Sequence, residues 1–133
     1  MQRTILITGA SRGIGRCIAE RLLREGHRLS LGLRQPGQLV GTVLDHPDVL
    51  RVPYDASDPS AADAFVEKTE EMWGGFDSLI HCAGCLHRTP LLFDAAAEPE
   101  LEELWRINLM GPWRLTRAAW QLLKQSGQGR IQV

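Results

Sequence analysis

Apolar and polar positions alternate along the chain in two different ways. Short runs rich in Ile, Leu and Val, of which Thr4–Thr8 is the first, carry apolar residues on both faces, as strands buried between two layers of helices do. Between these runs lie longer stretches in which apolar residues recur every three or four positions, the spacing of an amphipathic helix. This alternation predicts an α/β fold built from repeated strand-helix units on a parallel sheet.

Five strands are expected, and they cover residues 4–8, 27–34, 49–54, 76–82 and a last run that begins at Arg130. A chain of 133 residues is long enough to bury the core of one domain. Because the sequence halts at Val133, inside the fifth strand, we expect residues 1–133 to form a single domain that is cut within that strand.

The first helix is expected to begin at Gly13 and to end at Gly26, where glycine supplies a left-handed stop. Its predicted apolar face consists of Ile14, Cys17, Ile18 and Leu22. A short, weak helix is expected after Pro36, because Gly37 and Gly41 interrupt the pattern.

The next helix is expected to start at Asp58 and Pro59, a carboxylate N-cap followed by proline at the first helical position. It runs to Gly74, with one face formed by Phe65, Val66, Thr69, Met72 and Trp73. A long helical stretch follows from about Pro99 to Lys124. Pro112 has no N–H to donate to the carbonyl of Asn108, so we expect either a kink there or a new helix that begins at Pro112.

Composition and charge narrow the class of protein. Hydrophobic residues make up 44%, charged residues make up 23% and the net charge is -1, which is ordinary for a globular protein and offers no basic patch to nucleic acid. The apolar runs fall far short of the roughly 20 residues of a membrane span, and no signal peptide opens the chain. Three cysteines without such a signal predict reduced thiols. We therefore expect a cytoplasmic protein with no nucleic-acid or membrane partner.

A glycine-rich segment joins the first strand to the first helix, with the sequence Thr8-Gly9-Ala10-Ser11-Arg12-Gly13-Ile14-Gly15. Gly9 permits a tight turn, Gly13 lets the backbone approach a pyrophosphate, and Gly15 allows the helix and strand to pack closely. The free N–H groups at the helix start then bind the anion. A merely flexible turn is the alternative. The segment predicts a dinucleotide site that includes Thr8, Gly9, Ser11, Arg12, Gly13, Ile14 and Gly15.

The charges near the second strand indicate which dinucleotide is bound. A site that prefers NAD has an acidic residue at that strand end for the ribose hydroxyl, and no acid lies between Glu25 and Asp45. Arg34 lies at that end instead, and Arg12 lies in the glycine turn, so two guanidinium groups could bind a 2′-phosphate. We expect NADP(H) to be preferred, with NAD(H) as the alternative. The alternative is that both arginines are solvated surface residues.

The glycine spacing resembles the TGxxxGxG motif of the short-chain dehydrogenase/reductase family. Three further matches follow in the family's order: Asp55, then His81-Cys82-Ala83-Gly84 where the family usually has Asn-Asn-Ala-Gly, then Ile107-Asn108-Leu109. The resemblance covers essentially the whole chain and implies a Rossmann-type doubly wound sheet of strand order 3-2-1-4-5. It implies that Asp55 and Ala56 bind near the adenine, that Cys82, Ala83 and Gly84 lie along the cofactor, and that Asn108 belongs to a catalytic Asn-Ser-Tyr-Lys set.

The chain departs from this pattern at His81 and Cys82, which replace both asparagines, so the hydrogen bonds of those amides are lost or altered. Cys82 and Cys85 also form a C-x-x-C motif flanked by histidines, which is typical of redox or zinc sites. Four ligands within seven residues across a strand end would not readily converge. Small, half-buried thiols are the simpler interpretation, and no metal is expected.

The family's chemistry uses a tyrosine, a lysine four residues later and a serine. The only tyrosine here is Tyr54, which Asp58 follows at that distance, and the only lysines are Lys68 and Lys124. The resemblance implies an NADP(H)-dependent oxidoreductase, similar to 3-oxoacyl-carrier-protein reductases. Such an enzyme moves a hydride between nicotinamide and a carbonyl or hydroxyl carbon of a small-molecule substrate. We expect residues 1–133 alone to be inactive.

Two other functions remain open. The chain could be an inactive dinucleotide-binding module that acts as a sensor or scaffold. An FMN-binding flavodoxin-like protein is disfavoured because its phosphate loop lacks this glycine spacing. Relatives commonly dimerise through the long helix that ends near Lys124, which implies a homo-oligomer, dimer or tetramer. Trp113, Leu115 and Trp120 are then either interfacial or part of the core.

Overall fold

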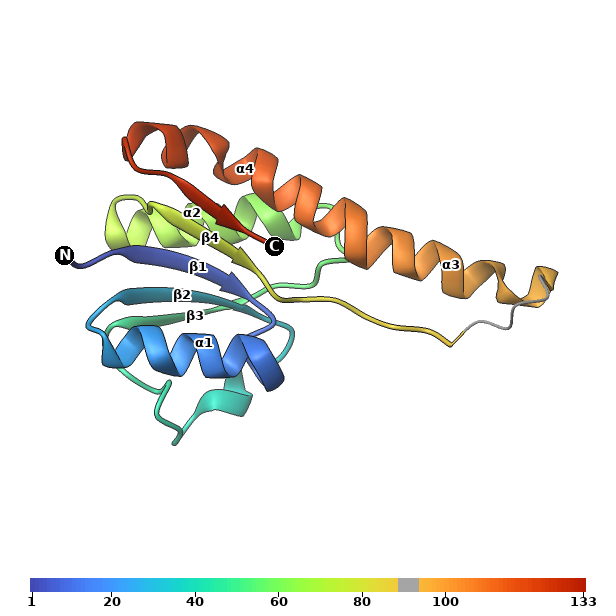
Figure 1. Ribbon diagram of the computed structural model, residues 1–133, viewed down its shortest axis with the longest axis horizontal. Coiled ribbons are helices and arrows are strands. Elements are labelled where there is room, and N and C mark those ends of the chain that lie inside the picture. The colour runs from blue at the N-terminus through green and yellow to red at the C-terminus, as the bar shows by residue number, and fades with distance from the viewer. Residues whose placement is uncertain (89–93) are drawn as a thin grey trace.

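A five-stranded parallel sheet forms the centre of the protein in the computed structural model, which describes residues 1–88 and 94–133 (Figure 1). The sheet has the order β3-β2-β1-β4-β5, and every neighbouring pair is parallel. The predicted strand order and directions are therefore confirmed. The strands are β1 (Thr4–Thr8), β2 (Arg28–Leu33), β3 (Val49–Pro53), β4 (Ser78–His81) and β5 (Arg130–Gln132).

Helices cover both faces of this sheet. The helical elements are α1 (Gly13–Arg24), η1 (Pro36–Leu39), α2 (Ala61–Trp73), η2 (Ala95–Ala97), α3 (Glu98–Trp105), the π-helical turn η3 (Arg106–Met110) and α4 (Gly111–Gln125). Figure 1 shows α1 on one side of the sheet and α2 with α4 on the other. The fold is thus a three-layer, doubly wound α/β arrangement, as the alternation of patterns predicts.

Successive residues of β1 point into two separate cores. Ile5 and Ile7 pack with α1 and β2, whereas Leu6, which is fully buried, packs with α2, β4 and α4. Side chains alternate between the faces of a strand, so a sheet covered on both sides needs apolar residues at every position. This requirement explains why the strands read as continuous apolar runs.

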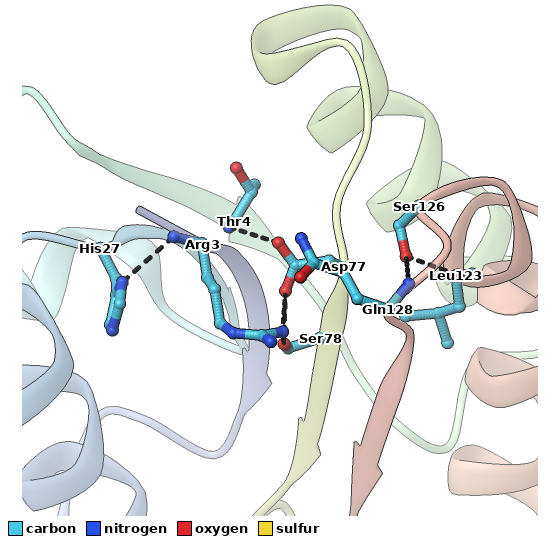
Figure 2. A network of polar contacts seen from close by, with 8 residues as sticks. All are labelled: Arg3, Thr4, His27, Asp77, Ser78, Leu123, Ser126 and Gln128. Carbon is cyan, nitrogen blue, oxygen red and sulfur yellow. Dashed lines mark hydrogen bonds and ion pairs between the residues drawn. The ribbon is translucent and has the colours of Figure 1, made fainter. Parts of the chain in front are cut away.

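The amino ends of the strands are joined by a polar cluster around Asp77, which is 8% exposed (Figure 2). Its carboxylate accepts hydrogen bonds from Arg3 Nη1 at 2.8 Å, from the backbone N of Thr4 at 3.2 Å and from Ser78 Oγ at 2.6 Å. The backbone N of Arg130 donates to its carbonyl at 3.0 Å. Asp77 therefore links β1, β4 and β5 at the end of the sheet opposite the glycine turn.

Two predictions about α2 are wrong in detail. Asp58 is not the N-cap of α2, which begins at Ala61 after Ser60. The Asp58 carboxylate instead accepts hydrogen bonds from the backbone N and Oγ of Ser60, because aspartate readily bonds two residues ahead and forms a turn of its own. Met72 is also not on the buried face of α2, since it is 53% exposed.

The buried face of α1 also differs from the predicted one. Ile14 is 78% exposed and Cys17 is exposed, whereas Gly15 and Ala19 are buried. Ile18 and Leu22 pack at the edge of the core as expected. The reason is that α1 lies close to the sheet, and only small residues such as Gly15 and Ala19 fit between the helix and the strands.

The long helical stretch is interrupted where Pro112 predicts it, but the interruption is a π turn. The backbone N of Gly111 donates to the carbonyl of Arg106, five residues back rather than the four of an α-helix. Figure 1 shows α3 and α4 continuing along one line on either side of this turn. The predicted disturbance is therefore present, and it takes the form of a π turn rather than a sharp kink or a break between helices.

Candidate functional site

The predicted site residues gather at the carboxyl end of the sheet. Because all five strands are parallel, the segments that follow them emerge at the same edge. The glycine turn follows β1, Arg34 follows β2, Asp55 and Ala56 follow β3, and residues 82–84 follow β4. Since β1 lies between β2 and β4, the glycine turn occupies the middle of this edge, where the chain crosses from one half of the sheet to the other.

The glycine turn is pressed against the end of β4. Gly9 has a φ of 71°, and a Cβ at this position would lie 2.6 Å from the backbone N of Ala83. A Cβ at Gly15 would lie 2.2 Å from the carbonyl oxygen of Gly9, so the first turn of α1 lies directly on the glycine turn. Any side chain at either position would force the backbone apart, which accounts for glycine at both.

The start of α1 is open to a ligand. Gly13 has a φ of 60°, and a Cβ there would meet no atom within 4 Å. The N-cap residue, Arg12, is extended and makes no side-chain cap, and the first turn contains no acidic residue. The backbone N–H groups at a helix start lack intrahelical partners and attract anions. This end of α1, with exposed Arg12 and half-buried Ser11 beside it, fits a phosphate group.

Thr8 fastens the loop after β4 to the central strand. Its side chain is 1% exposed, and its Oγ1 accepts hydrogen bonds from the backbone N atoms of Cys82, at 3.2 Å, and Ala83, at 3.1 Å. Thr8 was predicted to bind the cofactor, and in this structure its hydroxyl oxygen accepts both of these protein N–H groups. The threonine therefore sets the position of the segment that the resemblance assigns to the cofactor.

Asn108, the predicted catalytic residue, lies in the π turn and binds the next part of the same loop. Its Nδ2 donates to the carbonyl of Cys85 at 2.8 Å, and its Oδ1 accepts from the backbone N of Cys85 at 2.9 Å. A Cβ on Gly84 would lie 3.2 Å from Asn108 Oδ1, so glycine allows the close contact. Both polar atoms of the Asn108 side chain are thus hydrogen-bonded to the backbone of Cys85.

His81 and Cys82, which depart from the family's pattern, have distinct environments. His81 Nε2 forms a 2.9 Å hydrogen bond with Oγ1 of Thr116 on α4, and burial lowers the pKa of the imidazole. Burial raises the pKa of the Cys82 thiol. Within residues 1–88 and 94–133, no three His, Cys, Asp or Glu side chains converge on a common point that could hold a metal.

Arg34 and Asp55 lie exposed at the strand ends. The Asp55 Oδ1 accepts from the backbone N and Oγ of Ser57, at 2.9 and 2.7 Å, which fixes the carboxylate. Arg34 lies close enough to Cys85 to lower its pKa, although burial and the carboxylate of Glu103 outweigh this effect and raise it. Arg34 therefore lies near the loop after β4 as well as at the end of β2.

Tyr54 is part of the core rather than of the site. Its ring packs against Phe65 with 5.4 Å between ring centroids, and it is 5% exposed. Burial, reinforced by the Asp55 carboxylate and partly offset by Arg114, raises its pKa to about 12. A phenol in this environment is a poor proton donor or acceptor near neutral pH.

Sequence reasoning missed three contacts around the site. These are the Thr116 partner of His81, the pairing of His87 with Glu103, and the contact of Gly111 with Ala56, where a Cβ on the glycine would lie 2.8 Å from the Ala56 carbonyl oxygen. Each joins the long helix to the end of β4 or to a segment that follows β3 or β4. These contacts depend on how distant segments pack, so the sequence carried no clear signal for them.

The profile of the short chain dehydrogenase family matches residues 3–132. The chain belongs to this family. This short-chain dehydrogenase chain is 36% identical over 128 residues to an agropine synthesis reductase of Rhizobium rhizogenes, a match that covers 96% of the chain and 30% of that protein. It is 32% identical over 132 residues to the 3-oxoacyl-[acyl-carrier-protein] reductase MabA of Mycobacterium avium, covering 98% and 48% of the two chains.

A solved structure of another family member has the same fold. The alcohol dehydrogenase of the archaeon Thermococcus sibiricus, complexed with 5-hydroxy-NADP, is 31% identical and superimposes with a TM-score of 0.82, covering 98% of this short-chain dehydrogenase chain and 57% of the other. The chain thus spans about half or less of the length of the two curated relatives. Across the described residues, no helix is long and apolar enough to cross a membrane.

Proposed function

We propose that this chain is the nucleotide-binding part of an NADP(H)-dependent oxidoreductase. The observation that carries the proposal is the uncapped start of α1, where Gly13 leaves open space beside the exposed guanidinium of Arg12. The residues present fit a dinucleotide, with its pyrophosphate at residues 11–15 and its adenine near Asp55 and Ala56. The loop of Cys82, Ala83 and Gly84 would lie along the cofactor. The T. sibiricus relative, complexed with an NADP analogue, supports this reading.

When bound, the nicotinamide ring would supply or accept the hydride, and the substrate would be a small molecule with a carbonyl or hydroxyl carbon. The protein's own residues do the positioning. Thr8 and Asn108 fix the loop after β4 from two sides, through hydrogen bonds to the backbone of Cys82, Ala83 and Cys85. By fixing this loop, the two side chains would hold the cofactor in a defined position beside the substrate.

The preference for NADP(H) over NAD(H) is assigned to Arg34 and Arg12. Charge-assisted hydrogen bonds to a phosphate contribute about 1.5–3 kcal/mol each, which corresponds to roughly tenfold or more in affinity. We therefore expect Arg34→Ala to weaken NADPH binding about tenfold or more while NADH binding changes little. The test is calorimetric titration of both cofactors, with Arg24→Ala at the far end of α1 as the charge-matched control. Equal losses for NADPH and NADH would contradict the assignment.

We propose that residues 1–133 alone do not turn over a carbonyl substrate. No Tyr-x-x-x-Lys sequence occurs among them, and the pKa of Tyr54, raised to about 12 in the core, makes it unsuitable as a substitute. Purified residues 1–133 should therefore bind NADPH without oxidising it when a carbonyl compound such as an acetoacetyl ester is added. Sustained loss of NADPH absorbance above the substrate-free rate would overturn this proposal.

We propose that the protein forms a homo-oligomer through α3 and α4. Leu115, for which the interface and the core were both open, is fully buried in the core. Trp105, Trp113 and Trp120 are 62%, 53% and 50% exposed along the same helical rod, which supports an interface there. Sedimentation should detect a dimer or tetramer that Trp113→Asp dissociates, and an unchanged mass for this variant would refute the assignment.

A further inference from the structure

The loop after β4 is joined to the long helix at two points. At the first, Asn108 exchanges two hydrogen bonds with the backbone of Cys85, at 2.8 and 2.9 Å. At the second, Nε2 of His87 and Oε2 of Glu103 lie 2.5 Å apart. Figure 1 shows this loop running beside the helix after it leaves β4. The Glu103 carboxylate is also close enough to the Cys85 thiol to help raise its pKa.

The π turn favours this two-point contact. In a regular α-helix, residues five apart point in directions that differ by about 140°. Glu103 precedes the π turn by three residues, and Asn108 lies within it. Because hydrogen bonds of a π turn join residues five apart, the turn narrows the angle between these two side chains. Residues 85 and 87, two apart along the loop, can then each meet a partner on the helix.

We infer that His87 and Glu103 form a positioning pair that holds the loop after β4 in register with Asn108, and so fixes Gly84 and Ala83 at the cofactor. The inference rests on the proposed function only for its last step, the effect on the cofactor. The pair adds a second anchor beyond the Asn108 contact. Two anchors restrict both the distance and the rotation of a segment, whereas a single anchor leaves it free to pivot.

The first test measures the loop without any ligand. Amide hydrogen exchange of Cys85, whose N–H donates to Asn108, reports whether the loop opens. Glu103→Ala and His87→Ala should each accelerate this exchange by about two- to tenfold, the range expected when one hydrogen bond is lost. Glu103→Gln and His87→Gln keep an acceptor and a donor at the same reach, and both should restore slow exchange. Glu102→Ala, on the same helix, is the matched control.

The second test measures the cofactor. NADPH bound to the unaltered chain should show higher nicotinamide fluorescence anisotropy than NADPH bound to Glu103→Ala, while the thermal midpoints of the two proteins agree within about 2 °C. Glu103 is 48% exposed at its side chain, so the variant should fold. Equal rates of Cys85 amide exchange in Glu103→Ala and Glu102→Ala would overturn the inference that His87 and Glu103 hold the loop. Faster exchange with unchanged anisotropy would overturn its role toward the cofactor. Absence of NADPH binding by the unaltered chain would overturn the proposed function and leave the exchange test to decide the pair.

Discussion

Replacement of Thr8 by valine tests how the site is held together. Valine has nearly the shape of threonine but carries a methyl group in place of the hydroxyl. The substitution therefore removes one hydrogen-bonding oxygen from a residue that is 1% exposed. Two backbone N–H groups, those of Cys82 and Ala83, then lose the oxygen to which both donate. The added methyl group cannot compensate, because it accepts no hydrogen bond.

The expected cost follows from these two contacts. A buried N–H left without a partner costs about 1–3 kcal/mol, and Cys82 and Ala83 are half-buried, so each should lie toward the lower end. We therefore expect Thr8→Val to lower the free energy of unfolding by about 2–4 kcal/mol. With a urea dependence of about 2 kcal/mol per molar, the unfolding midpoint should fall by roughly 1–2 M.

Urea unfolding followed by circular dichroism measures this loss, and Thr8→Ser is the matched control. Serine keeps the oxygen and loses one methyl group, which should cost only about 1 kcal/mol. Thr8→Val should also weaken NADPH binding, because the loop it releases is the one assigned to the cofactor. If the two variants unfold within about 0.5 kcal/mol of each other, the hydroxyl does not hold the loop and the reasoning is refuted.

Three further predictions concern the same edge of the sheet. Gly15→Ala should destabilise the protein by about 1–3 kcal/mol in urea, because a Cβ there would lie 2.2 Å from the Gly9 carbonyl oxygen; a gain in stability, as helix propensity alone predicts, would contradict this. Pro112→Ala supplies the N–H that the Asn108 carbonyl lacks, so it should convert the π turn toward α-helix. The shift of Asn108 should then accelerate amide exchange of Cys85. Unchanged exchange would show that the π turn does not help to hold the loop. Burial lowers the pKa of His81 below its ordinary 6.5, so its contribution to stability is complete above that value and is lost as the pH falls through the lowered pKa. His81→Gln should flatten the fall in stability between about pH 7 and about pH 5, and an equally steep fall in both proteins would contradict the assignment.

The strands were predictable because their signal is local. A run such as Thr4–Thr8, apolar on both faces and followed by glycines, is required by any strand buried between helices, so its bounds agree with the structure. The role of Gly15 was predictable for the same reason, because its close contact is with the Gly9 carbonyl oxygen in the same strand-turn-helix unit. The contact of Gly9 with Ala83, by contrast, joins segments that are distant in sequence. The order of the strands followed from the resemblance and is confirmed.

The errors arise where distant segments meet. The exposure of Ile14 depends on how closely α1 lies against the sheet, and helical periodicity does not contain that distance. The hydrogen bond between His81 and Thr116, which the sequence did not indicate, depends on which side of the long helix faces β4. The π turn rotates the residues of α4 about the helix axis relative to those of α3. The spacing of apolar residues does not reveal this rotation.

The position of β1 between β2 and β4 also determines the order in which the parts of the site assemble during folding. Thr4 pairs with Arg28, 24 residues later, whereas Thr8 pairs with His81, 73 residues later. Closing the longer loop costs more chain entropy, so the β1–β2 pair is expected to form before the β1–β4 pair. The glycine turn meets residues 82–84 only when this late, non-local pair has closed. A ligand that contacts both the glycine turn and residues 82–84 would bind only the fully folded domain. By stabilising the contact that forms last, it would slow unfolding.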